Sequence, residues 1–214
     1  MHRSTLPVLA LLIAACATDV PTAAPPAAEI MERMDHAGHP VMTVPEGELG
    51  PAVLKELAQV RRATAAFHDL DAATAAGYTA WSPNPFAPNA TCPSSAAGRM
   101  GYHRVNVPLR GGAANPAAGD AVIDPMRPEM LLYEKRADGE MHLVGVEYIV
   151  FKAAWEREHG VGAAPPTVFG QPLLFSRHTF PGNANPIDHY ELHVWIWSSN
   201  PNGMFSPWNP DVTC

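Results

Sequence analysis

The amino-acid sequence predicts an α+β fold, in which an N-terminal helix or helix pair packs on a mainly antiparallel β-sheet with long ordered loops. Apolar side chains recur at spacings of three, four and seven over residues 53–70, which is typical of an amphipathic helix. Asp138-Gly139 lies between two strand-like runs, a strong hairpin signal. Residues 189–197 alternate as a strand does, and the 23 prolines and 16 glycines indicate long loops.

The length of 214 residues suits one domain with a tail. We expect a lipoprotein signal peptide over residues 1–15, a tether and Met/His-rich arm over 16–49, and a single α+β domain over 50–214. The net charge of -7, with only 14 Lys and Arg residues, excludes a nucleic acid as the expected partner, because such binding needs clustered cations.

The first residues indicate export. An apolar run from Leu6 to Ala15 follows a short basic start and ends at Cys16, and it is too short to span a membrane. The small residues before Cys16 resemble a bacterial lipobox, so we expect the cysteine to be lipidated and to anchor the chain in the cell envelope. Ala17 after it favours the outer membrane, on its periplasmic side or surface, in a Gram-negative source. The alternative is an ordinary signal peptide cleaved nearby.

The arm that follows the tether is rich in thioethers and imidazoles. Thioether sulfur selects Cu(I), and imidazole suits copper and zinc, so this segment resembles the arms of periplasmic copper-handling proteins. A poorly ordered tail, or a short helix docked on the domain, explains the same composition. The candidate accessory ligands are Met31, Met34, His36, His39 and Met42.

Two helices are expected at the start of the domain. Pro51 suits a first helical position, and the apolar stripe predicts a helix to about Phe67. Residues 68–71 offer an N-cap for a second, short helix that ends before Gly77. A further short helix is expected over residues 152–158.

Residues 78–101 are predicted to form a long ordered loop, because Pro and Asn punctuate them. The loop contains Cys92, and Cys214 is the only other cysteine left after lipidation. In an exported protein these two most simply form a disulfide, which would stabilise the fold by roughly 3–5 kcal/mol. Ligation of a metal by the thiolates is the rival interpretation.

Strands are expected over residues 101–107, 130–134, 141–151 and 173–176, and no structure is assigned to 108–128. A two-residue turn at Asp138-Gly139 would pair Tyr133 with Val144 and Leu131 with Val146. Glu147, on the opposite face of this hairpin, is either on a solvated sheet face or a buried carboxylate near a site.

The last strand carries the most chemistry. His189, Glu191 and His193 are expected to share one face with Trp195 and Trp197. A His-Glu-x-x-His zinc motif is excluded, because it needs a helix and a Glu directly after the first His.

Strand spacing limits how this face can hold a metal. Residues two apart on a strand lie about 6.6 Å apart and residues four apart about 13 Å, so His189 and His193 cannot readily share one ion. We expect a site of His193 with Glu191 or with a histidine from another strand, His103 being the leading candidate and His178 a weaker one. His189 would join through a bend or act behind the ligands.

Several motifs together resemble an uncharacterised family of exported bacterial proteins and lipoproteins. They are Gly-Tyr-His103, Leu-Leu-Tyr-Glu134, Phe-Gly-Gln171-Pro, His189-Tyr-Glu-Leu-His-Val-Trp195 and Asn209-Pro-Asp-Val-Thr-Cys214. The resemblance covers residues 52–214 and implies that this region is one unit. It implies no activity.

The sequence favours an exported lipoprotein that binds copper or zinc at a His/Glu site on a sheet face, which would serve metal handling. One alternative is an enzyme in which Glu191 orients His193 as a general base. The other is a structural or ligand-binding envelope protein whose histidines only bond within the fold. The sequence names no protein partner.

Overall fold

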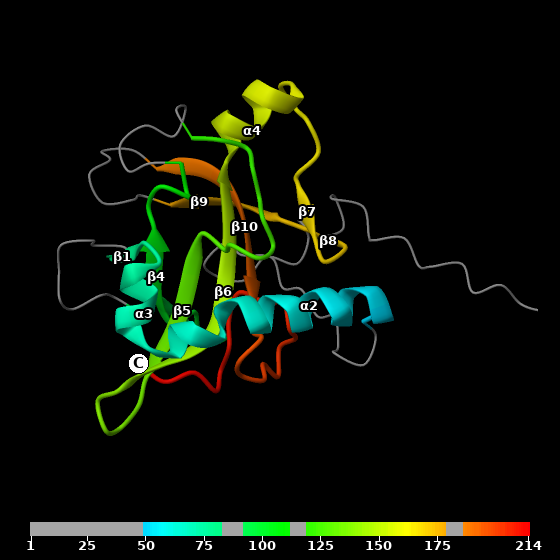
Figure 1. The fold of residues 1–214 in the computed structure, drawn as a ribbon. Coiled ribbons are helices and arrows are strands. Elements are labelled where there is room, and N and C mark those ends of the chain that lie inside the picture. The colour runs from blue at the N-terminus through cyan, green and yellow to red at the C-terminus, as the bar shows by residue number, and fades with distance from the viewer. Residues whose placement is uncertain (1–48, 83–91, 112–118, 179–185) are drawn as a thin grey trace, which may run out of the picture.

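The computed structural model describes residues 49–82, 92–111, 119–178 and 186–214 (Figure 1). The predicted signal peptide, the lipidated Cys16, the tether and the Met/His arm lie outside the described residues and stay predictions. Within the part of the chain that is described, no helix is both long enough and apolar enough to cross a membrane.

A six-stranded antiparallel sheet forms the centre of the domain. Its strand order is β1-β4-β5-β6-β10-β9, so the strands of the predicted hairpin are its middle. Two short two-stranded ladders, β2-β3 and β7-β8, lie outside it. The bounds are β1 Tyr78–Ser82, β2 Ser94–Ser95, β3 Gly98–Arg99, β4 Tyr102–Asn106, β5 Met130–Lys135, β6 Met141–Phe151, β7 Thr167–Val168, β8 Gln171–Pro172, β9 Leu174–His178 and β10 Ile187–Val194.

The helices fall where the sequence predicts them, and the predicted α+β class is confirmed. Helix α2 spans Pro51–Thr64 and continues as the 3-10 turn η2, Ala65–His68. Helix α3 spans Leu70–Ala75, and the side chain of its N-cap Asp69 accepts hydrogen bonds from the first-turn amides. Helix α4, Lys152–His159, directly follows β6.

The two faces of the sheet bury different clusters. Helices α2 and α3 lie across one face (Figure 1), where Leu57 and Val60 join the main core with apolar side chains of β5 and β6. The opposite face carries a smaller apolar cluster of Val105, Met130, Ile149 and Phe151, with Ala154 of α4. Both faces are buried, so polar side chains on the second face are enclosed.

The predicted loop over residues 78–101 starts too early, because residues 78–82 form edge strand β1 and pair with β4. Pro83 is the first proline of the segment, and proline cannot donate to a sheet ladder. The Pro-rich loop composition therefore begins only after Ser82, five residues later than predicted.

The hairpin register agrees with the prediction at one predicted pair and differs at the other. Leu131 pairs with Val146 as expected, but Tyr133 pairs with Leu143, because a bulge follows Leu132. The turn is longer than two residues: the amide of Arg136 bonds the carbonyl of Glu140. The bulge adds one residue to one strand, so Tyr133 and Val144 still lie on the predicted face with Leu131 and Val146 although the pairing has shifted.

Strand β10 ends at Val194, three residues before the predicted end. The amide of Trp195 bonds the carbonyl of Met204, and its indole N–H donates to the carbonyl of Ser206 at 2.6 Å. Trp195 belongs to the main core. The prediction that it shares a face with His193 is therefore wrong, because the chain leaves the ladder at this point.

Cys92 and Cys214 lie at disulfide-bonding distance, with their Cα atoms 6.1 Å apart, as predicted. The C-terminal segment is also held by the bridge between Arg99 and Asn209 and by the amide of Lys135, which donates to the carbonyl of Thr213. The disulfide thus ties the end of the chain to the segment that precedes β4.

Replacing Cys92 and Cys214 together by serine is expected to lower the free energy of unfolding by roughly 3–5 kcal/mol, because the bond closes a long loop in the unfolded chain. Urea denaturation of wild type and variant, with and without a reductant, measures this loss. The reductant should bring the wild type to the stability of the variant and leave the variant unchanged. Equal midpoints for the oxidised wild type and the variant would contradict the expectation.

Candidate metal centre

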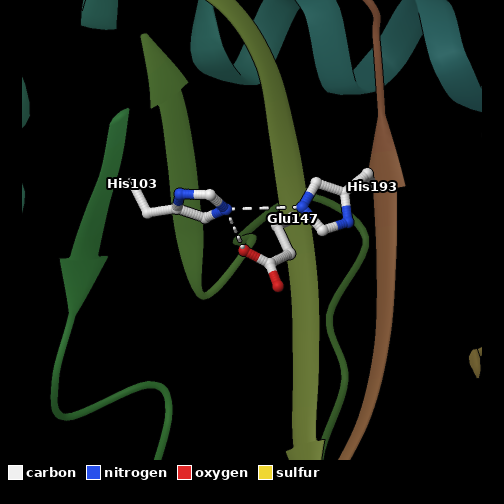
Figure 2. Close-up of side chains that lie close together, drawn as sticks. All are labelled: His103, Glu147 and His193. Carbon is white, nitrogen blue, oxygen red and sulfur yellow. Dashed lines mark hydrogen bonds and ion pairs between the residues drawn. The ribbon is translucent and has the colours of Figure 1, made fainter. Parts of the chain in front are cut away.

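Three strands bring two imidazoles and a carboxylate together on the second face of the sheet. His103 comes from β4, Glu147 from β6 and His193 from β10, and Figure 2 shows their side chains converging. Nε2 of His103 lies 3.3 Å from Nε2 of His193 and 3.3 Å from Oε2 of Glu147. The three ligand atoms all lie within 4.8 Å of one another, so the group could hold a metal ion.

The sheet register explains why these residues meet. His193 is directly opposite Glu147 in the β6-β10 ladder, and opposed residues of an antiparallel pair project from the same face. His103 lies two strands away, because β5 separates β4 from β6. His103 pairs with Leu132 of β5, and Leu132 pairs with Gly145 of β6, which is two residues from Glu147. The imidazole of His103 therefore reaches diagonally across β5.

Gly145 lets the chain after His193 approach β6 closely. A Cβ atom built at this position would lie 2.7 Å from the carbonyl oxygen of Val194 and 3.2 Å from a methyl group of Leu132. A side chain here would push β6 and the end of β10 apart. A glycine in this strand therefore marks a close backbone approach next to the site.

The group is almost closed to solvent: His103 is 7%, Glu147 3% and His193 2% exposed. Burial, and then the charge and hydrogen bond of Glu191, raise the pKa of Glu147 well above its ordinary value, and the nearby guanidinium of Arg110 opposes this rise. Of the two alternatives for Glu147 left by the sequence, the structure shows the buried carboxylate.

Oε2 of Glu147 is the least satisfied atom of the group. Although it faces the imidazole of His103, it has no partner of hydrogen-bond geometry among the described residues. A cation bound between the two imidazoles and this oxygen would give it a partner. The residues present therefore fit a metal ion.

His189 and Glu191 form a second pair directly behind the carboxylate. His189 Nδ1 lies 2.9 Å from the carbonyl of Ile187, which can only accept, so Nδ1 is the donor. His189 Nε2 lies 3.0 Å from Oε2 of Glu191. Glu191 in turn shares a hydrogen bond with Glu147, which requires a proton because two carboxylates can only accept. This chain of contacts fixes the orientation of Glu147.

The structure thus brings together two of the four residues that the sequence predicts as ligands, His103 and His193. Glu147 completes the group, whereas Glu191 contacts His189 and lies behind the ligand atoms. The backbone of His178, on β9, pairs with that of Ile187 on β10. The side chain of His178 lies outside the described part of the structure. The role of His103, His189, Glu191 and His193 as metal ligands stays a prediction.

Two imidazoles with one carboxylate form a donor set that suits zinc and other transition metals. Without a metal, the contact between the two Nε2 atoms is a hydrogen bond only if one nitrogen carries a proton and the other does not. The same geometry therefore allows either a metal site or a proton-sharing pair.

Comparison of the chain with protein-family models, with curated proteins and with solved structures finds no match.

Proposed function

We propose that this protein binds one transition-metal ion, copper or zinc, at His103, Glu147 and His193, as a lipid-anchored protein of the cell envelope. The observation that carries the proposal is the convergence of three potential ligand atoms, from three strands, within 4.8 Å of one another. Three ligand atoms gathered this closely by separate strands suit a cation.

The burial of the group supports metal binding over a surface histidine cluster. Nearly complete exclusion of water strengthens the attraction between a cation and its ligands. It also leaves Oε2 of Glu147 unsatisfied when no cation is present. An enclosed site of this kind exchanges its ion slowly, so the metal is expected to stay bound during purification.

The pair behind the ligands adds to this support. Metal-binding carboxylates and imidazoles usually bond to further polar groups, which orient them and adjust their basicity. Glu191 and His189 supply such a chain to Glu147 and end it on the carbonyl of Ile187. On this proposal Glu191, which the sequence predicts as a ligand, positions the ligand Glu147.

The envelope part of the proposal rests on the sequence. The apolar run before Cys16 supports export and lipid anchoring, with the outer membrane favoured by Ala17 in a Gram-negative source. The Met/His arm would then lie between the anchor and the domain. We propose that it is an accessory copper or zinc binder that raises the local concentration of metal near the domain.

Metal analysis of the full-length protein, purified without a polyhistidine tag, tests the proposal. After removal of metal by a chelator, incubation with Zn²⁺ or copper and removal of the excess, we expect about one tightly held ion per chain. Protein that retains no stoichiometric zinc or copper would leave the histidines with a purely structural role and overturn the proposal.

Deleting residues 29–42 separates the two candidate sites. The deletion variant should keep the tightly held ion, because the buried group lies wholly within the folded domain. If binding is lost with the arm and survives alanine at His103, the arm is the site and the strands are only structure.

A further inference from the structure

We infer that the ion is zinc, held in tetrahedral geometry, with Glu191 outside the coordination sphere as the positioning partner of Glu147. This inference rests on the proposed metal binding and narrows it from copper or zinc to one ion and one geometry. The separations of the ligand atoms, the kinds of donor and the position of the nearest sulfur carry it.

Two of the three separations between the ligand atoms match a tetrahedron. An ion with bonds of about 2.0–2.1 Å holds its ligand atoms about 3.3–3.4 Å apart in tetrahedral geometry and about 2.9 Å apart at neighbouring corners of a square plane. His103 Nε2 lies 3.3 Å from each of the other two ligand atoms, in the arrangement of Figure 2. These two separations agree with the spacing around Zn²⁺, whereas Cu²⁺ in a square plane would require His103 Nε2 to lie closer to both of the other ligand atoms.

The kinds of donor argue against Cu⁺. None of the three ligand atoms is sulfur, whereas thiolate and thioether ligands select Cu⁺. Cys92 and Cys214 are joined to each other and supply no thiolate. The nearest thioether by register is Met130, directly opposite Glu147 on β5, and it packs in the apolar cluster with Val105, Ile149 and Phe151.

Substitution with Co²⁺ tests the geometry, because Co²⁺ replaces zinc and its visible absorption is far more intense in tetrahedral than in six-coordinate sites. Apo-protein titrated with Co²⁺ alone should develop intense visible bands that saturate at one equivalent and disappear when Zn²⁺ is added. Glu191→Gln should keep the tetrahedral bands but weaken Co²⁺ binding by roughly 10–100-fold, as loss of an outer partner does.

Met130→Leu provides the matched test for copper. It should leave Co²⁺ and Zn²⁺ binding unchanged, because its thioether is not a ligand on this inference. Weak six-coordinate absorption, loss of the bands in Glu191→Gln, or tight Cu⁺ binding that Met130→Leu abolishes would each overturn the zinc inference. Those outcomes would leave the proposed metal binding standing, whereas a protein that binds none of these ions overturns both.

Discussion

Replacing His103 or His193 by alanine is expected to weaken zinc binding by more than about 100-fold, because loss of an outer partner alone costs about 10–100-fold and these residues are proposed as direct ligands. Each imidazole supplies one of the three ligand atoms. Isothermal titration or competition with a metal-binding dye measures the affinity of each variant.

His142→Ala is the matched control, since His142 lies on β6 near the hairpin turn, pairs with Glu134 and is not one of the three clustered residues. It should bind zinc like the wild type. Circular dichroism of every variant shows whether the fold persists, and His103→Gln keeps more of the buried volume if alanine unfolds the chain. A folded variant at His103 or His193 that binds zinc normally would contradict the ligand assignment.

Raising the pH from about 4.5 to 8 is expected to destabilise the metal-free protein through Glu129. Burial raises the pKa of Glu129 from an ordinary value of 4.5 to about 8. In that window the unfolded chain has lost a proton that the folded chain retains, so stability falls as pH rises, by up to about 1.4 kcal/mol per pH unit. The stabilising contribution is fully present below pH 4.5 and is lost by pH 8.

Glu129→Gln should remove this part of the pH dependence, because glutamine stays neutral and its carbonyl can still accept the amide hydrogen bond of Ile149. The buried Glu147 contributes in the same direction, so some slope remains. Urea denaturation at several pH values with a chelator present measures the difference. Glu140→Gln, in the exposed hairpin turn, serves as the control. Identical slopes for wild type and Glu129→Gln would show that Glu129 is not the source.

Much of the fold follows from local patterns in the sequence. The helical spacing before Phe67, the N-cap at Asp69 and the hairpin around Asp138-Gly139 are set by residues close together in the chain, and the structure has all three. The disulfide could be predicted because, with Cys16 assigned to a lipid anchor, the sequence offers Cys92 only one partner, Cys214. Such features depend on neighbours or on chemistry, and they need no knowledge of the tertiary arrangement.

The site was predictable only in part, because it depends on which strands are neighbours. Strand spacing shows that His193 needs a partner from another strand, and the structure brings His103 to it. Glu147 joins them because β10 pairs with β6 in one particular register. Nothing in residues 141–151 or 189–197 alone specifies this pairing, so a carboxylate in an apolar strand was the only signal for Glu147.

The prediction of where β10 ends was wrong for a related reason. The alternation of residues 189–197 continues past Val194, but Trp195 bonds to the segment around Met204 and turns its indole into the main core. A long-range contact therefore overrides a local strand pattern. At the same point of the chain, the backbone of Val194 and Trp195 lies next to Gly145.

An X-ray structure of the zinc-loaded protein, with anomalous data collected across the zinc edge, tests the central claim most directly. A single strong anomalous peak is expected about 2.0–2.2 Å from Nε2 of His103, Nε2 of His193 and a carboxylate oxygen of Glu147. A peak held only by the Met/His arm, or two imidazoles hydrogen-bonded to each other with no peak between them, would contradict it.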